Sequence, residues 1–352
     1  MITNRLLKYL SYSGLIFFLS CSDNPNGDSF NDYFSETELI EIQGKEVPLI
    51  VQGNPLSYMF NMAFFDSLIL VNEYPDNEYT YKLIDLRNNT VSPFGKKGEG
   101  PNELLTDAFS FSFDHNTSRL FLTDNIHYYV HDVRNLKKNE YDPIEKFTID
   151  QKETRFVSST VHVDGYIVGS MYHKRFCAYN IEREKFIEKV EYEGGPSMAL
   201  ANQAFYMNHP TGRKVVYCMS RVPEFGIIEI KDGDLLINKF SWGKTKLGVQ
   251  HGEGTMAVLD NDEAKFEFMS VATSEDHIYI LYSGKKPASN TRDDRVSAAL
   301  TNIIYVLDWN GNPLKRYQID KYLRSIAIDG KTNTLYGSSY EENPSLISYK
   351  LK

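Results

Sequence analysis

The sequence predicts an all-β fold, a six-bladed β-propeller with four-stranded blades. Beyond residue 60, short runs of β-branched and aromatic residues alternate with polar residues and are separated by turns rich in Asn, Asp and Gly, which is typical of antiparallel hairpins. One strand pattern recurs six times, with its polar residue at positions 85, 132, 180, 229, 308 and 350. Four of the five intervals lie between 42 and 49 residues, and a period in the forties is typical of propeller blades.

A second apolar run precedes each copy of this pattern, so every repeat carries at least two strands. The one long interval separates Glu229 from Asp308 and exceeds a period by about thirty residues. The surplus falls in residues 242–268 and 284–302. The second stretch is polar and rich in turn residues, which predicts a long loop within blade five. Long loops on a rigid scaffold are places where function concentrates.

The two ends of the chain are expected to close the ring. Residues 38–52 have strand character and precede the first repeat, whereas the sixth copy ends at Leu351. We expect an N-terminal strand to complete the last blade and cover its exposed edge. The predicted organisation is a signal peptide over residues 1–20, a flexible tether over 21–37 and a single propeller domain over 38–352.

The N-terminus indicates export and lipidation at Cys21. A basic start is followed by an apolar stretch of about ten residues that ends in Leu19 and Ser20, which is a secretory signal too short to span a bilayer. A cysteine at the cut resembles a bacterial lipobox, in which the thiol is diacylated. A plain secreted signal or an N-terminal anchor helix are the alternatives. The polar, lightly acidic residues after Cys21 are similar to a surface-export signal, so display on the cell surface is one expectation.

A family resemblance covers essentially the whole chain. The glycine-rich segment Gly95–Leu104 resembles a motif of the six-bladed TolB-like propeller lipoproteins of Bacteroidetes, which are similar in pattern to NHL-repeat propellers. Leu122–Val133 resembles the strand–Asp–strand core of an NHL blade, and Val306–Leu314 fits the family's last-but-one blade. The resemblance implies a propeller in the cell envelope, as an outer-membrane lipoprotein, and it supplies no common catalytic residues.

Composition excludes one class of partner and limits disulfides. The formal net charge of −9 and the absence of any Lys/Arg block argue against nucleic-acid binding. Cys177 and Cys218 are the cysteines outside the signal, and both stand in apolar strand-like runs. We expect buried free thiols, with one bridge as the alternative in an oxidising envelope. We expect a monomer that meets the membrane through its lipid anchor.

No cofactor, metal or catalytic motif is assigned. The Gly95–Gly100 glycines lack the following helix that phosphate binding needs, and they predict a turn between blades. His127 and His131 on a strand lie too far apart to share a zinc ion. A single ion in the central channel stays open as an alternative. The acidic repeat positions, such as Asp85, predict a structural role in turns because they recur in every blade.

Candidate ligand-binding residues lie where loops of neighbouring blades converge. Tyr172, His173 and Arg175 follow an inner strand of blade three, and Arg221 stands at the matching position of blade four. His251 lies in the first surplus stretch and is expected to reach the same mouth. Cationic and aromatic groups together suit an anionic or sugar-like ligand.

The function that this sequence favours is a non-catalytic binding module for a glycan, a peptide or a partner protein. It depends on the anchor, the repeat scaffold and the missing catalytic signature. Two alternatives remain. One is an envelope polysaccharide hydrolase or lyase with paired carboxylates in the channel, which would need acid and base groups about 5 to 10 Å apart. The other is a scaffold of an outer-membrane assembly, which would need a large apolar face.

Overall fold

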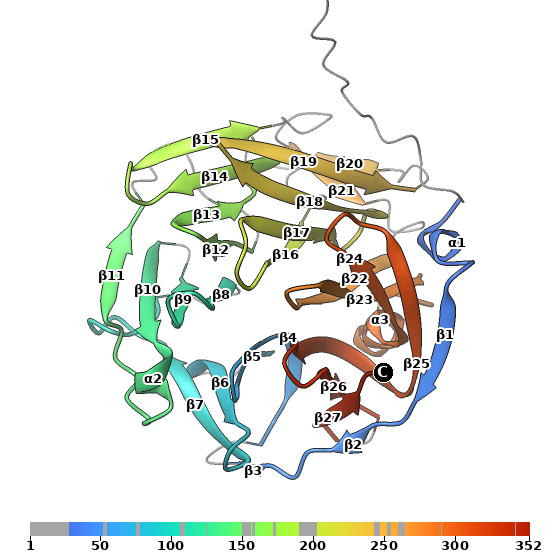
Figure 1. Cartoon of the computed structure of the whole chain (residues 1–352), viewed down its shortest axis with the longest axis horizontal. Coiled ribbons are helices and arrows are strands. Elements are labelled where there is room, and N and C mark those ends of the chain that lie inside the picture. The colour runs from blue at the N-terminus through green and yellow to red at the C-terminus, as the bar shows by residue number, and fades with distance from the viewer. Residues whose placement is uncertain are drawn as a thin grey trace, which may run out of the picture.

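The chain folds into a ring of β-sheets arranged like blades around a central axis (Figure 1). The innermost strands of successive blades contact one another all the way round, and the last blade contacts the first. The computed structural model describes residues 28–51, 55–74, 78–105, 110–124, 126–149, 156, 159–171, 174–189, 203–242, 247–251, 255–259, 265–289, 291–341 and 343–352.

The first four blades are separate antiparallel sheets, and their strands follow one another outwards from the axis. Blade one contains β4 (Tyr58–Phe65), β5 (Leu68–Tyr74), β6 (Tyr79–Asp85) and β7 (Thr90–Lys96). Blade two contains β8 (Ser110–Asp114), β9 (Arg119–Thr123), β10 (His127–Asp132) and β11 (Glu145–Thr148). Blade three contains β12 (Val161–Val163), β13 (Tyr166–Gly169), β14 (Phe176–Asn180) and β15 (Lys185–Lys189). Blade four contains β16 (Ala204–Asn208), β17 (Lys214–Met219), β18 (Glu224–Lys231) and β19 (Asp234–Ser241).

Blades five and six share the long strand β25 (Pro313–Asp329). Leu323 pairs with Thr301 on one side and with Ser339 on the other, so the outer strand of blade five continues as the inner strand of blade six. The other strands of blade five are β22 (Phe266–Thr273), β23 (His277–Lys285) and β24 (Thr301–Asp308). Those of blade six are β26 (Thr334–Ser339), β27 (Ser345–Lys350) and the N-terminal β2 (Lys45–Glu46). The predicted six-bladed architecture and its closure by an N-terminal strand are confirmed.

The N-terminal segment covers more of the ring than the single strand we expected. β1 (Glu38–Ile42) runs parallel to β25 on blade five, and β3 (Ile50–Val51) runs parallel to β7 on blade one. With β2 on blade six, three short strands follow the outer rim (Figure 1). Gly44 passes so close to blade six that a Cβ there would clash with Ile347. The segment therefore covers sheet edges on three consecutive blades.

The tether is shorter than the sequence predicted. Residues 28–37 were expected to be part of it, but α1 (Phe30–Tyr33) and its flanking residues pack on blades four and five. Ser29 caps the helix by accepting a hydrogen bond from the backbone N–H of Asp32, as N-cap residues do. The Phe30 and Phe34 side chains are fully buried. The physical reason is that burying two aromatic side chains lowers the free energy by more than ordering the polar residues around them raises it.

The core is divided among the interfaces between blades. Six clusters of buried apolar side chains each join two neighbouring blades. Because both faces of a blade are covered, a middle strand can be apolar at every position, and Leu68–Val71 is buried throughout. Tight packing between the sheets of neighbouring blades explains why the strands carry so many β-branched and aromatic residues.

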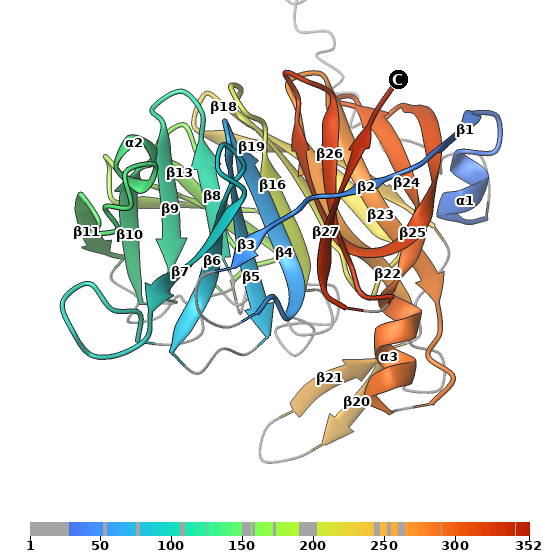
Figure 2. The same cartoon turned by 90° about the horizontal axis from the view of Figure 1, so that it is seen from below.

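The two faces of the disc differ in what they carry. On one face, the turn face, short turns join the first and second strands of each blade. The opposite face, the loop face, carries α3 (Arg292–Ala299) and the hairpin of β20 (Leu247–His251) and β21 (Thr255–Leu259), which project from the disc in Figure 2. We expected a loop where α3 lies. Thr291 caps this helix and two aspartates occupy its first turn, so a local capping signal was present. The short helix α2 (Val133–Leu136) follows β10.

Candidate functional site

Several of the residues predicted from the sequence lie outside the part of the chain that the structure describes. These are Cys21, Tyr172 and His173. The backbone of His251 ends β20 on the loop face, but its side chain is not among those described. Of the predicted ligand-binding residues, the structure therefore describes the side chains of Arg175 and Arg221.

Arg175 is part of a buried ion pair between blades three and four. Its Nη2 donates to the Glu224 carboxylate at 2.7 Å, and the Tyr217 hydroxyl donates to the same carboxylate oxygen at 2.9 Å. Both partners of the ion pair are buried. Burial lowers the pKa of Arg175, but the charge and hydrogen bond of Glu224, together with Tyr217 and Tyr206, outweigh it and the net shift is upward. The guanidinium thus holds two blades together.

Arg221 lies on the loop face in the connection between β17 and β18, and its surroundings are different. Its guanidinium stacks on the ring of Phe266, with 3.6 Å from the central carbon to the ring centroid. Burial, reinforced by the positive charges of Arg295 and Arg324, lowers its pKa to about 10. No carboxylate among the described residues forms an ion pair with it. Three arginines from blades four, five and six therefore share one region.

A continuous series of cationic and aromatic side chains extends from Arg221 across blade five. Phe266 pairs with Lys285 across the β22–β23 ladder, and directly opposed residues of an antiparallel pair place their side chains on the same side of the sheet. The Lys285 ammonium lies 5.2 Å from the ring centroid of Tyr322, which is 44% exposed. We call Arg221, Phe266, Lys285 and Tyr322 the basic–aromatic row.

Arg324 stands beside the end of this row and near the central axis. Its Nε donates to the Tyr58 hydroxyl at 3.1 Å and its Nη1 to the Met269 carbonyl at 2.7 Å. The Tyr58 ring packs against that of Tyr340, with centroids 4.6 Å apart. These contacts tie the inner strands of blades five, six and one together. Arg324 is positioned by the fold rather than by an acidic partner.

The carboxylates on the neighbouring loops are engaged elsewhere. Asp294, in the first turn of α3, accepts a hydrogen bond from the Ser289 hydroxyl. Glu341 pairs with Lys321 at 2.7 Å. Glu267 follows Phe266 in β22, and its buried carboxyl interacts with Tyr282. Burial raises the pKa of Glu267. In the described part of the chain, none of these three groups forms an ion pair with Arg221 or Lys285.

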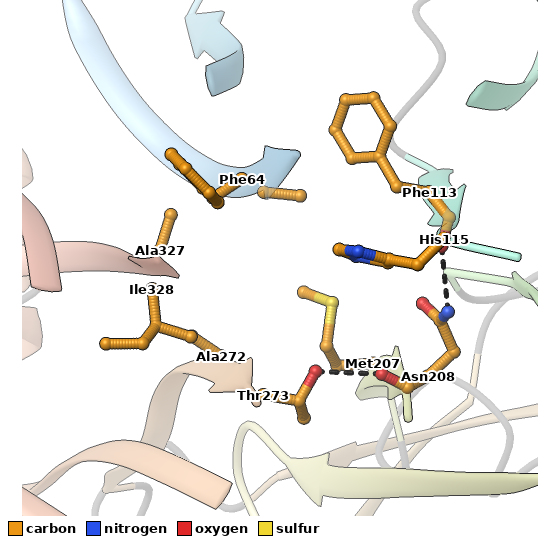
Figure 3. Close-up of a pocket in the computed structure, with 10 residues that line it drawn as sticks. Phe64, Phe113, His115, Met207, Asn208, Ala272, Thr273, Ala327 and Ile328 are labelled. Atoms are coloured by element: carbon orange, nitrogen blue, oxygen red, sulfur yellow. Dashed lines mark hydrogen bonds between the residues drawn. The ribbon is translucent and has the colours of Figure 1, made fainter. Parts of the chain in front are cut away.

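The central channel holds a small cavity at the turn face (Figure 3). Its volume is about 20 Å³, which is room for about one or two water molecules. Asn208 donates to the Phe113 carbonyl and Thr273 to the Asn208 carbonyl, so the polar groups of the wall bond one another. Burial lowers the pKa of His115, whose ring points into the cavity, to about 4. The described lining contains no carboxylate.

Other residues singled out in the sequence have structural roles. Asp85, Asp132 and Asp308 accept hydrogen bonds from the backbone N–H groups two residues later, which confirms the predicted turn role. Cys177 and Cys218 are buried and unbridged, also as predicted. In the described part of the chain, no group of three His, Cys, Asp or Glu side chains is placed to hold a metal ion.

The glycine-rich segment before blade two forms a tight turn. Gly95 has a positive φ of 68°, and Lys97 and Leu104 pair in an isolated bridge. The Glu103 carboxylate accepts from the Gly100 N–H at 2.9 Å and pairs with Lys96 at 2.8 Å. The turn is built around a carboxylate, so it is not a cradle for phosphate.

Comparison with known families agrees with this geometry. The profile of the TolB-like 6-blade propeller-like family matches residues 45–331, which is more than half of the chain. The chain belongs to this family. No curated protein matches it.

Solved structures similar to this TolB-like propeller share its fold at low sequence identity. A Bacteroides fragilis NCTC 9343 protein, provisionally named as exported, is 12% identical with a TM-score of 0.51, and the match covers 89% of this chain and 99% of that one. A protein of unknown function from Bacteroides thetaiotaomicron VPI-5482 is 11% identical with a TM-score of 0.51, and the match covers 90% of this chain and 75% of that one. The β-propeller domain of Cps50 (Swd1) from Myceliophteria thermophila is 9% identical with a TM-score of 0.50, and the match covers 85% of this chain and 99% of that one.

Sequence reasoning found one member of the basic–aromatic row and missed the others. Arg221 was identified because it follows an inner strand. Lys285 and Tyr322 stand in polar segments with no distinguishing pattern. Their proximity to Arg221 arises from the β22–β23 register and from the crossing of β25 between blades. Tyr340 stands directly after β26, and its OH accepts a hydrogen bond from the Met59 N–H.

Proposed function

We propose that this TolB-like propeller is a lipid-anchored protein of the cell envelope that acts as a non-catalytic binding module for a glycan, a peptide or a partner protein. The observation that carries the proposal is the group of arginines on the loop face. Arg295 and Arg324 each lie close enough to Arg221 for their positive charges to act on it, although the chain as a whole has a net charge of −9. Gathering like charges costs free energy, and a bound anion offsets that cost.

The shape of the two faces supports binding at the loop face. The cavity at the turn face holds only small molecules, whereas the loop face carries α3 and the β20–β21 hairpin (Figure 2). Long insertions on a rigid scaffold are where propeller-like folds place recognition. The ring supports the loops through interfaces between every pair of neighbouring blades.

The chemistry of the described channel favours binding over hydrolysis. Glycoside cleavage needs two carboxyl groups facing one another across the substrate, and the described lining of the channel cavity supplies none. Glu267 is a buried carboxyl next to the row, but its partner is Tyr282 rather than a second carboxyl group.

Anchoring at Cys21 and envelope location are parts of the same proposal. They rest on the signal-like N-terminus, and a fold relative from Bacteroides fragilis carries a provisional name as an exported protein. No helix within the described residues is long and apolar enough to cross a membrane.

Affinity electrophoresis combined with a reducing-end assay tests the functional proposal. The full chain is run through gels that contain a panel of polysaccharides and is then incubated with the same polymers. We expect at least one polymer to retard the protein without release of new reducing ends. Release of reducing ends would show an enzyme instead. Absence of retardation by every polymer would exclude glycans and leave a peptide or partner protein as the ligand.

A further inference from the structure

We propose that the basic–aromatic row binds an anionic polysaccharide, one that carries carboxylate or sulfate groups on its sugar rings. This inference rests on the proposed function and names its ligand class. The row lies on the loop face and extends from the β17–β18 connection of blade four, across the open end of blade five, to the crossing into blade six. Its groups alternate between a cation and an aromatic ring.

The anion-binding part of the site is the Arg221 guanidinium. One of its faces is covered by the Phe266 ring at 3.6 Å, so the N–H groups at its planar edge are the ones that can meet a ligand. A guanidinium edge matches the two oxygens of a carboxylate or sulfate group, and such bidentate pairs are among the stronger hydrogen bonds in proteins. Arg295 and Arg324 add positive charge to the same region.

The second cation of the row occupies a fixed position. The Lys285 ammonium donates to the Leu300 carbonyl at 2.7 Å, next to the end of α3. It lies on the side of the β22–β23 ladder that carries Phe266, because the two residues are direct register partners. Two cations from neighbouring blades are therefore linked through Phe266, which Arg221 contacts through its ring and Lys285 faces across the ladder. An ammonium group has three donors, of which one is used here.

The aromatic part favours a sugar over a peptide. Tyr322 is 44% exposed and stands beside the Lys285 ammonium, so a ligand at Lys285 also contacts the exposed ring. The flat apolar face of a pyranose ring packs on such a surface, since aromatic side chains offer a large, rigid apolar area. An acidic sugar polymer repeats one anion and one ring face per unit. An acidic peptide repeats the anion but has no ring face.

The test compares charged and uncharged forms of one polymer. Isothermal titration of the full chain uses an oligogalacturonate, its methyl-esterified form, a heparin-derived oligosaccharide and poly-L-glutamate of similar charge. We expect the oligogalacturonate or the heparin fragment to bind, the esterified form to bind at least about tenfold more weakly, and binding to weaken with added salt. Comparing the two acidic sugars separates carboxylate from sulfate as the recognised group.

Variants place the site. Arg221→Ala should weaken binding by about tenfold or more, Arg221→Lys by less, since it keeps the charge but loses the planar edge. Tyr322→Ala should weaken binding of the sugar without altering how that binding depends on salt. The matched control is Arg134→Ala, which removes the same charge from an exposed side chain at the start of α2 and should change the affinity less than about twofold. Unchanged far-UV circular dichroism and melting temperature verify the fold of each variant.

Four results would overturn the inference. One is equal affinity for the esterified and free oligomers, another is equal loss in Arg221→Ala and Arg134→Ala, and the third is poly-L-glutamate binding as tightly as the sugars. Failure of both acidic sugars to bind would also overturn it. These outcomes differ from a failure of the proposed binding function, which is shown by cleavage of the polymer. A neutral polymer that binds without cleavage would keep that function and refute only the anionic ligand.

Discussion

Replacing Phe30 with alanine should destabilise the whole propeller, although Phe30 precedes the first blade. Its side chain is fully buried and its ring centroid lies 4.7 to 6.0 Å from six other rings. These rings belong to Phe34, Phe225, Trp242, Phe268, Tyr282 and Tyr305. Removing a buried phenylalanine side chain leaves a cavity and costs about 3 to 5 kcal/mol. That is a large part of a stability of about 5 to 15 kcal/mol.

Urea unfolding with two probes measures this effect. The chain has two tryptophans, and in a Trp309→Phe background the remaining Trp242 lies 5.3 Å from Phe30. Its fluorescence reports the α1 contact, while far-UV circular dichroism reports the blades. We expect both signals to shift together in Phe30→Ala, because α1 bridges blades four and five. Leu39→Ala, at a 47% exposed position of the same N-terminal segment, is the control.

The size and coincidence of the two transitions decide the outcome. The control should change the free energy of unfolding by less than about 0.5 kcal/mol. A Phe30→Ala effect no larger than the control would refute the view that α1 is part of the folded core. A fluorescence change at lower urea than the loss of circular dichroism would show that α1 detaches first. The decrease in stability would then be limited to the free energy of docking that segment.

Three further predictions concern the anchor, the buried ion pair and a buried histidine. Cys21→Ser should abolish labelling by a fatty-acid probe, and equal labelling of both proteins would contradict lipidation. Arg175→Ala should lower the free energy of unfolding by about 3 to 5 kcal/mol because Glu224 is left buried without its partner, while sugar binding stays unchanged; a stable single variant would contradict the structural role. Burial lowers the pKa of His131 to about 4, whereas the unfolded imidazole keeps a value near 6.5. The unfolded state therefore binds a proton that the folded state excludes, and stability falls as the pH falls from 6.5 towards 4. Between pH 7 and pH 5, the free energy of unfolding of His131→Phe should fall by roughly 1 to 2 kcal/mol less than that of the natural protein. Equal decreases for the two proteins in urea titrations would contradict this.

The ring itself could be predicted from the sequence because each blade repeats the same local pattern. A polar residue at the end of the third strand of a blade accepts backbone hydrogen bonds in the following turn, as Asp85 and Asp308 do. That requirement fixes the residue type at a fixed interval, and the interval fixes the architecture. Closure by an N-terminal strand followed from the need to cover the edge of the last blade.

Features that depend on contacts between distant segments were not predictable in the same way. The aromatic residues Phe30 and Phe34 stand in a polar stretch, and only the pocket between blades four and five shows why they are buried. Likewise, Arg175 and Arg221 occupy matching positions in neighbouring blades. One meets a carboxylate from the next blade and the other meets an aromatic ring. The difference depends on which side chain the neighbouring blade supplies.

Hydrogen–deuterium exchange with and without bound oligogalacturonate tests the central claim most directly, because it locates the ligand on the intact protein. The claim is that recognition takes place on the loop face at the basic–aromatic row. It predicts slower exchange in residues 220–224, 265–268, 283–285 and 321–324, with no change in the short turns of the opposite face. Protection confined to the turn face or to the outer strands, while these four segments exchange as before, would contradict it.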